Sequence, residues 1–542
     1  MDGSTWNLRG ACARSDKYPA MQPRHYRQAR WRHFWGVHPG QAQSLSSLLC
    51  LVTFLIAQPA SAAQFVRDPT RPIEPDPRPS TVLAYQGTHL SWTEFASGST
   101  PATDVWNSVA RAAGAGNSLA LGPDLDGDCS PELLLAGIGP AAQYWISGNR
   151  QGGSSGTATL PRGLVWAVDP RSSKVLRAWQ GAGAFDRMGT CMLTLDDLDG
   201  DGVGEIAITS PGAAEARGQV ELFSSRDGSR LRVYVGEELN AGFGSSLVLL
   251  PDLDSDGLRD LAVGAPLGRG HESTSGCVLL LSTRTGEVLA NIPGPQAGSA
   301  FGHALNAELD LTGDGIRDLL IGAPSFCPVP ELPHAGLVLI VSPIDGLVAG
   351  VIEGKWPEQS LGVAVGALPA FDESPLGEVV VACGAHWNCG SARGVLLYFA
   401  SPQFTLTDAW IEPPSCGSPD TSFGASLAVL DDLDGDGGLE VAVGAPTHDG
   451  CDDPWGMGFV CFSPGGECGE RALVSRWVNR EWNLGSFAAA IIRFPDLDGD
   501  DVDEYVIGAP DPVFNLPGGA QIRSGRRGGL LKQIVGEHLP VP

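Results

Sequence analysis

Residues 243–266 read FGSSLVLLPDLDSDGLRDLAVGAP. The stretch begins with a Phe-Gly pair, continues through an acidic loop at Asp252–Asp260, and ends in an apolar run followed by Gly-Ala-Pro. Similar stretches recur at intervals of roughly 55 to 75 residues. The other acidic loops begin at Asp124, Asp197, Asp310, Asp432 and Asp496. A repeat of this length predicts a fold built from similar units that stack on one another.

A seventh, degraded unit is expected between the loops at Asp310 and Asp432, because two repeat lengths separate them. Ser360-Leu361-Gly362 stands in the place of the Phe-Gly pair, and residues 379–386 stand in the place of the apolar run and its Gly-Ala-Pro. The intervening stretch, Phe371–Gly377, lacks alternating carboxylates. We therefore expect seven units, of which six keep the acidic loop. The stretch at 371–377 should keep a strand-loop-strand shape without a metal.

Each Gly-Ala-Pro is followed by a β-rich run, a short turn such as Asp227-Gly228 or Thr285-Gly286, and a second run. This pattern is typical of β-hairpins. With the strands that flank the acidic loop, each unit has four antiparallel strands, and no window shows a sustained helical period. Small sheets must stack to bury their faces, and closing the stack into a ring hides their edges. The sequence therefore predicts an all-β fold, a seven-bladed β-propeller of four-stranded antiparallel blades. A β-helix would need shorter repeats, and separate sandwiches would not share one repeated unit.

The acidic loops have the composition of a cation site. Counted from the first Asp, carboxylates at positions one, three and five of a tight loop direct oxygens toward a common centre. A backbone carbonyl at position seven and an acid at position nine can complete the shell. An oxygen-only, flexible shell suits Ca²⁺ better than Mg²⁺. We therefore expect about five or six Ca²⁺ sites. The candidate ligands, loop by loop, are Asp124, Asp126, Asp128 and Glu132; Asp197, Asp199, Asp201 and Glu205; Asp252, Asp254, Asp256 and Asp260; Asp310, Thr312, Asp314 and Asp318; Asp432, Asp434, Asp436 and Glu440; and Asp496, Asp498, Asp500 and Glu504.

Two alternatives compete with this interpretation of the loops. Asp and Gly are common turn residues, but four neighbouring carboxylates repel one another unless a cation neutralises them. In an EF-hand loop the last ligand is at position twelve, whereas here the acid is at position nine and a strand follows. Gly at position six permits the positive φ of a sharp loop, but Cys129 and Asp501 occupy that position in the first and last loops. Those two sites are expected to bind more weakly.

The Phe-Gly, Asp-x-Asp-x-Asp-Gly-x-x-Asp and Gly-Ala-Pro elements together resemble the FG-GAP repeats of the integrin alpha-subunit propeller and of related bacterial secreted proteins. The resemblance covers about residues 114 to 538. Departures are Ala115-Gly116, Met188-Gly189 and Phe487-Ala488 in place of Phe-Gly. The resemblance implies ligand recognition on a loop-bearing face opposite or beside the metals, and thus a binding or adhesion module.

The partner is expected to be an extracellular protein or glycan whose identity the sequence does not give. Candidate contact surfaces are Ala141–Arg162, with Tyr144 and Trp145, and Cys383–Cys389, with His386 and Trp387; the alternative for both is a variable surface loop. A formal net charge of −27 makes nucleic acid an unexpected partner.

The N-terminus reads as an export signal. Four arginines between Arg24 and Arg32 precede the apolar run Leu48–Ala57 and the small-x-small motif that ends at Ala62. We therefore expect a signal peptide at 1–62, a proline-rich linker or extension at 63–100 and the propeller at 101–542. The mature protein should be secreted or periplasmic. There is no second long apolar run, so we expect no membrane span.

Ten cysteines follow the expected cleavage site, an even number suited to an oxidising compartment. Plausible local pairs are Cys383 with Cys389, Cys461 with Cys468, and Cys416 with Cys451. Three others are expected as buried thiols, namely Cys129, Cys191 and Cys277.

The alternative function is that of a propeller-fold hydrolase or lyase with its active site in the central channel. Gly424-Ala425-Ser426 resembles a nucleophile elbow. Similar Gly-x-Ser sequences open the same run in other units, so we interpret them as strand starts. We expect no catalytic residues.

Overall fold

The computed structural model describes residues 115–137, 162–183, 185–270, 274–368, 376–384, 395–400, 403–411, 423–433, 439–446, 457–461, 473–478, 487–510, 518–536 and 539. The first strand begins at Ala115, inside the segment expected for the propeller. The segments expected as signal peptide and linker lie outside these residues.

The described chain forms seven four-stranded antiparallel sheets, and in each sheet the strand order is the order of the sequence. The strands are β1 (Ala115–Leu121), β2 (Leu133–Gly137), β3 (Leu164–Val168) and β4 (Val175–Gln180); β5 (Met192–Thr194), β6 (Ile206–Ser210), β7 (Gln219–Phe223) and β8 (Arg230–Val235); β9 (Ser246–Leu250), β10 (Asp260–Ala265), β11 (Cys277–Leu281) and β12 (Val288–Pro293); β13 (Ala304–Asn306), β14 (Leu319–Ala323), β15 (Leu337–Val341) and β16 (Val348–Glu353); β17 (Leu361–Leu368), β18 (Glu378–Cys383), β19 (Val395–Ala400) and β20 (Thr405–Ile411); β21 (Ser426–Val429), β22 (Val441–Ala445), β23 (Met457–Cys461) and β24 (Leu473–Val478); and β25 (Ala490–Phe494), β26 (Glu504–Gly508), β27 (Gly519–Arg523) and β28 (Leu530–Val535). One short helical turn, α4 (Ala213–Ala216), joins β6 to β7.

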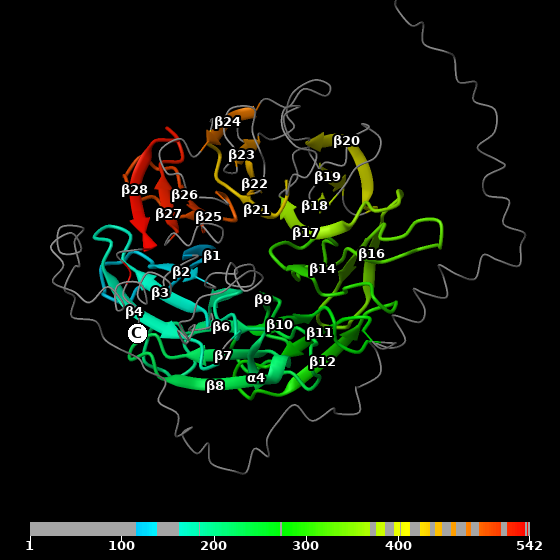
Figure 1. Ribbon diagram of the computed structural model, residues 1–542, viewed down its shortest axis with the longest axis horizontal. Coiled ribbons are helices and arrows are strands. Elements are labelled where there is room, and N and C mark those ends of the chain that lie inside the picture. The colour runs from blue at the N-terminus through cyan, green and yellow to red at the C-terminus, as the bar shows by residue number, and fades with distance from the viewer. Residues whose placement is uncertain are drawn as a thin grey trace, which may run out of the picture. The chain divides into compact units, whose positions relative to one another are not determined.

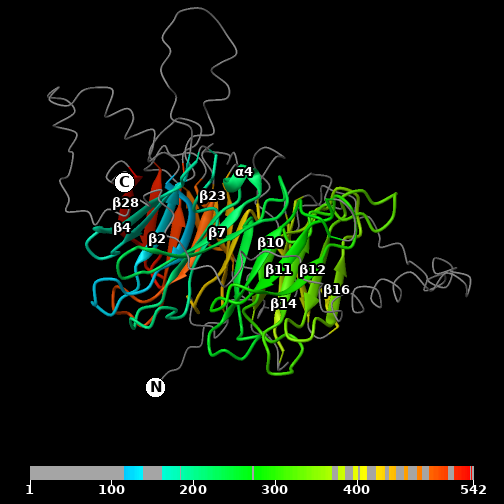
Figure 2. The same cartoon turned by 90° about the horizontal axis from the view of Figure 1, so that it is seen from below.

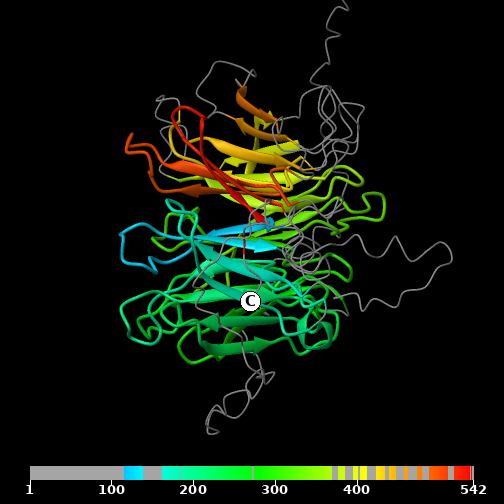
Figure 3. The same ribbon diagram turned by 60° about the vertical axis from the view of Figure 1, so that its left-hand side comes forward.

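The sheets follow one another around a ring (Figure 1). The first strand of each sheet contacts the first strand of the next, and β25 contacts β1. Figure 3 also shows β25–β28 beside β1–β4. The predicted all-β, seven-bladed propeller is thus confirmed. We number the blades 1 to 7 in chain order.

The hydrophobic core lies between the blades. The second strands β2, β6, β10, β14, β22 and β26 are buried along their whole length. In blade 3, Val263 of β10 pairs with Leu247 on one side and Leu279 on the other. At the closure of the ring, Trp166 of blade 1 belongs to the same buried cluster as Phe494 of blade 7. Stacking of blade faces therefore supplies the burial that a single sheet could not achieve.

The joint between neighbouring blades explains the glycines of the repeat. Gly276, which precedes the third strand of blade 3, forms a parallel bridge with Phe301 of the next blade and has φ +83°. A Cβ atom there would lie 2.3 Å from the Phe301 carbonyl oxygen. The same approach recurs at Gly163 and Met188, Gly218 and Phe243, Gly336 and Leu361, and Gly518 and Ala115. The Gly518–Ala115 joint closes the ring with the contact found at the four described boundaries between blades 1 and 5.

The departures from Phe-Gly fit this joint. Ala115 and Met188 are buried in the place of Phe, and the following Gly116 and Gly189 keep positive φ. In the last unit Ala488 adopts φ +65°, and its N–H donates to the Gly508 carbonyl at 2.9 Å. The position therefore requires the left-handed backbone more strictly than it requires glycine.

The degraded unit forms blade 5. Its strands β17 and β18 pair antiparallel on either side of the predicted connection, as expected. Residues 369–375 of that connection lie outside the described part of the chain, so the predicted absence of a metal there stays a prediction.

The cysteine expectations are partly wrong. Cys383 is a buried free thiol in the cluster between blades 4 and 5, so the predicted pair with Cys389 is not formed. Burial raises the pKa of the Cys383 thiol to about 12, which keeps it neutral. Cys277 is buried as expected, whereas Cys191 is half-buried and Cys129 is exposed because it lies in a surface loop. The other two predicted pairs, Cys461 with Cys468 and Cys416 with Cys451, involve side chains outside the described residues.

Within the described residues, we find no helix with the length and hydropathy needed to cross a lipid bilayer.

The joint predicts a large effect of Gly276→Ala. The matched control is Gly298→Ala, because Gly298 has φ +74° but no atom lies within 4 Å of the place that its Cβ would occupy. The control should lose about 1 kcal/mol of unfolding free energy from backbone strain alone. Gly276→Ala should lose roughly 3 kcal/mol or more, because its methyl group meets the backbone of the next blade. Urea unfolding of the two variants would measure the difference. Equal losses would contradict the proposed role of the joint.

Candidate metal centres

The six acidic loops share one face of the propeller. Each connects the first and second strands of a blade, and antiparallel order places it on the same face as the turn between the third and fourth strands. The connections between the second and third strands, and those between blades, lie on the opposite face. Figure 2 shows α4, one of these connections, at the upper edge of the blades.

Four loops bring carboxylate oxygens within 4.8 Å of one another. The fullest group is that of blade 2, with Asp197, Asp199, Asp201 and Glu205. The other three groups are Asp124, Asp126 and Glu132; Asp252, Asp254 and Asp260; and Asp496, Asp498 and Asp500. The predicted ligands Asp128, Asp256 and Glu504 lie outside the groups of their own loops.

The remaining two loops differ. The loop that begins at Asp310 has Thr312 at position three. Among the described residues, its carboxylates, Asp310, Asp314 and Asp318, do not form a group with oxygens within 4.8 Å of one another. In the loop of blade 6, Asp434 and Asp436 lie outside the described residues. Asp432 and Glu440 stand at the two ends of that loop.

The position-one aspartate shapes each loop by accepting backbone N–H groups. Asp197 accepts from Gly200 at 2.6 Å and from Gly202 at 2.8 Å. The Gly202 N–H is the main reason that the pKa of Asp197 lies below its ordinary value. Equivalent bonds to position six are made by Asp124, Asp252, Asp310 and Asp496. Cys129 and Asp501 adopt the left-handed backbone that Gly202 adopts, with φ of 66° and 65°.

The position-nine acid ties each loop to the interior. One carboxylate oxygen of Glu205 accepts the N–H of Leu198, and its other oxygen, Oε1, is buried without a hydrogen-bond partner. Asp318 Oδ1 is buried in the same way. The position-two to position-nine bond recurs from Leu125 to Glu132, Leu253 to Asp260, Leu311 to Asp318, Leu433 to Glu440 and Leu497 to Glu504, at 2.7–2.9 Å.

Burial makes these acids poor anions without a cation. It raises the pKa of Glu132, Glu205 and Glu504 to about 7, and that of Asp260 to about 6. The neighbouring carboxylates raise these pKa values further, while the position-two N–H lowers them. A site with these properties favours the ionised form only when positive charge is brought to it.

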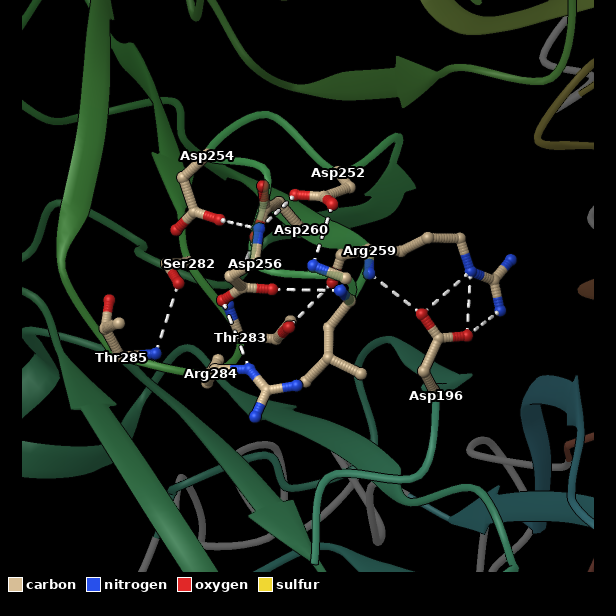
Figure 4. Close-up of polar contacts among 12 residues, drawn as sticks. Asp196, Asp252, Asp254, Asp256, Arg259, Asp260, Ser282, Thr283, Arg284 and Thr285 are labelled. Atoms are coloured by element: carbon tan, nitrogen blue, oxygen red, sulfur yellow. Dashed lines mark hydrogen bonds and ion pairs between the residues drawn. The ribbon is translucent and has the colours of Figure 1, made fainter. Parts of the chain in front are cut away.

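Two arginines at the loop of blade 3 pair with aspartates (Figure 4). Arg259, at position eight, forms an ion pair with Asp196 of blade 2, in which Nη2 and Nε both donate to Oδ1, at 2.7 and 2.9 Å. Arg284, from the turn between β11 and β12, lies 3.6 Å from Asp256 Oδ2. The Arg259 guanidinium is the main reason that the pKa of Asp196 is lowered.

Sequence reasoning alone missed the turn arginines, such as Arg284, that lie beside the acidic loops. The signal that could have found them was an arginine at the same place in the third-to-fourth-strand turn of several blades: Arg171, Arg226, Arg284 and Arg526.

A model described as the FG-GAP repeat matches residues 243–276. Integrin alpha-V of Gallus gallus is 26% identical over 185 residues, which cover 32% of this chain and 17% of that protein. Integrin alpha-X of Homo sapiens is 36% identical over 191 residues, covering 33% and 15%. Integrin alpha-8 of Gallus gallus is 28% identical over 240 residues, covering 41% and 22%.

The chain carries an FG-GAP repeat and is similar to integrin alpha subunits. The expected resemblance to FG-GAP repeats and integrin alpha subunits is thus confirmed, while the resemblance to bacterial secreted proteins stays a prediction. The matched residues span about a fifth or less of the length of these relatives.

The FG-GAP joint also accounts for the Gly-x-Ser sequences. The Ser246 hydroxyl donates to the Gly302 carbonyl of the next blade at 2.7 Å, and Ser426 donates to the Ala488 carbonyl at 2.9 Å. Both hydroxyls therefore link blades, which supports their interpretation as strand starts. The two expected contact surfaces, at 141–162 and 383–389, lie outside the described residues apart from their ends.

The position-nine acids predict an unusual pH dependence for the metal-free protein. The folded pKa values of Glu132, Glu205 and Glu504, about 7, lie above the ordinary value of 4.5, so the folded state binds more protons than the unfolded state up to about pH 7. The free energy of unfolding contributed by these groups should therefore fall as pH rises through that window. Urea unfolding in chelator at about pH 5 and about pH 7.5 would measure it.

The matched variant is Glu205→Gln, which keeps an oxygen for the Leu198 N–H but cannot ionise. Without metal, its stability relative to the parent protein should improve between the lower and the higher pH. An unchanged difference between the two proteins across this range would contradict the assignment.

Proposed function

We propose that this chain is a secreted, calcium-binding β-propeller that acts as a non-catalytic binding or adhesion module for an extracellular protein or glycan. The similarity to integrin alpha subunits supports the binding module. The acidic loops of the blades support the proposed calcium binding.

The single observation that carries the calcium proposal is the loop of blade 2. Four carboxylates converge there within 4.8 Å, and the buried Glu205 Oε1 has no protein partner. Two ligands on opposite sides of a Ca²⁺ ion, at ~2.3 to 2.6 Å each, would be separated by a similar span. A donor set made only of oxygens fits a hard cation. When bound, the ion would supply the positive charge that these carboxylates lack.

The proposed ligands are the loop residues given by the sequence, in about five or six sites. The loop of blade 2 fits best. The loops of blades 1, 3 and 7 each bring three carboxylates together. For blades 4 and 6 the proposal rests on the sequence pattern and on the position-nine acid, whose bond to position two they share with the others.

The proposed contact face is the one opposite the acidic loops. Leu239 and Leu267 are each 56% exposed, and Val329 is 45% exposed. All three lie on connections at that face, in blades 2 to 4. The Leu267 N–H donates to the Ala241 carbonyl, which holds two of these connections together. Exposed apolar side chains on one face are candidates for an interaction surface.

Calcium removal should lower the melting temperature. Each filled site stabilises the native state by ~2.7 kcal/mol at a hundredfold excess of ligand over Kd. Asp254→Ala should cost less than chelation because only one blade is affected. Melting curves with excess Ca²⁺ and with chelator, at fixed ionic strength, would test this. Indistinguishable curves would remove calcium from the proposal and leave the propeller.

The contact face can be tested separately. A screen of extracellular proteins and glycans for Ca²⁺-dependent binding would first supply a ligand. Leu239→Glu with Leu267→Glu should then weaken binding at least tenfold, as expected for apolar contacts at an interface centre. Leu530→Glu is the matched control, because Leu530 is 40% exposed but lies on the outer strand of blade 7. Equal binding by both variants would place the contact elsewhere.

A further inference from the structure

The turn between the third and fourth strands carries an arginine at the same position in four described blades. The equivalence is set by a shared hydrogen bond that closes each turn, such as Gly228 N–H to Ser224 and Gly286 N–H to Ser282. The four arginines are Arg171 in blade 1, Arg226 in blade 2, Arg284 in blade 3 and Arg526 in blade 7. Each turn shares a face with the acidic loop of its own blade.

Two of these arginines contact their own loop. Arg171 Nη1 lies 3.0 Å from Asp128 Oδ2, and Arg284 Nε lies 3.6 Å from Asp256 Oδ2. Asp128 and Asp256 both stand at position five. Among the described residues, Arg226 and Arg526 make no such ion pair with a loop carboxylate.

The arrangement of the carboxylates also differs between the blades with this ion pair, 1 and 3, and the blades without it, 2 and 7. In blades 2 and 7 the position-five residues, Asp201 and Asp500, belong to the converging group. In blades 1 and 3 the groups contain positions one, three and nine, and they leave out Asp128 and Asp256. The position-five carboxylate is thus absent from the group in the two blades where the arginine pairs with it.

We propose that Arg171 and Arg284 compete with the cation for the position-five carboxylate of their own loops. This inference rests on the proposed calcium binding and adds an order to it: the loop of blade 2 fills at a lower Ca²⁺ concentration than the loops of blades 1 and 3. A guanidinium and a bound cation repel each other, and the carboxylate must leave one to ligate the other. The arginines thus set the affinity of individual blades.

Blade 3 offers the cleaner test, because Gly257 occupies position six of its loop as Gly202 does in blade 2. The Arg284 side chain is 54% exposed, so Arg284→Gln should leave the fold intact. The pair contributes as a partly exposed ion pair, since the Asp256 side chain is 15% exposed. Its removal should lower the half-filling Ca²⁺ concentration of this loop by about three- to fivefold.

Arg226→Gln is the matched control. It removes the same charge from the same turn position in blade 2, where the ion pair is not formed. It reports the long-range charge effect alone, which we expect to change the half-filling concentration of its loop by less than about twofold.

Hydrogen–deuterium exchange with mass spectrometry, over a Ca²⁺ series at fixed ionic strength, would follow peptides covering 197–205 and 252–260 separately in the full chain. The expected result is an earlier transition for 197–205 in the parent protein, and a shift of only the 252–260 transition in Arg284→Gln. Equal shifts in Arg284→Gln and Arg226→Gln, or no shift in either, would overturn the competition while leaving calcium binding intact. An absence of any Ca²⁺-dependent protection in every protein would instead overturn the proposed function and, with it, this inference.

Discussion

The contact between the backbones of successive blades is the constraint on which the rest of this propeller depends. At Gly276 and Phe301 the two chains approach so closely that no side-chain atom fits between them. This approach fixes the distance and angle at which one blade face meets the next. The apolar second strands then fill the space between the faces. Because the joint is repeated at Gly518 and Ala115, the first and last blades meet under the same constraint as blades 3 and 4.

The acidic loops are built on this frame through their position-nine acids. Glu205 directly precedes β6, a fully buried strand, so its carboxylate is held at the boundary between core and solvent. The hydrogen bond that its carboxylate accepts from the Leu198 N–H holds the beginning of the loop against that boundary. The loop is therefore preorganised by the blade, and its other three carboxylates already lie within 4.8 Å of one another and of Glu205. The same burial disfavours the ionised form of Glu205, so stability and cation affinity depend on one carboxylate.

Much of this could be predicted from the sequence because the repeat carries its own geometry. The glycines of Phe-Gly and Gly-Ala-Pro mark joints, and the alternating aspartates mark loops. Blade 5 was recognisable from its spacing although its loop motif is lost.

Other features depend on side-chain placement across separate segments, which no local pattern encodes. The Arg259–Asp196 pair joins residues 63 positions apart, and the burial of Cys383 depends on the packing of a neighbouring blade. The position-five aspartates look identical in sequence, yet Asp201 belongs to the converging group of its loop, whereas Asp256 does not and lies 3.6 Å from an arginine in another turn.

The way in which the ring closes has a consequence for how the chain can be cut. In the part of the chain that the structure describes, every sheet consists of four consecutive strands, so no sheet combines the two ends of the propeller. A break between any two blades would leave all hydrogen-bonded ladders whole, and joining the ends at Ala115 and Val535 would restore a continuous chain. Among the described boundaries, those between blades 1 and 5 and the one that closes the ring share the same joint, so the closure is not distinguished from the others.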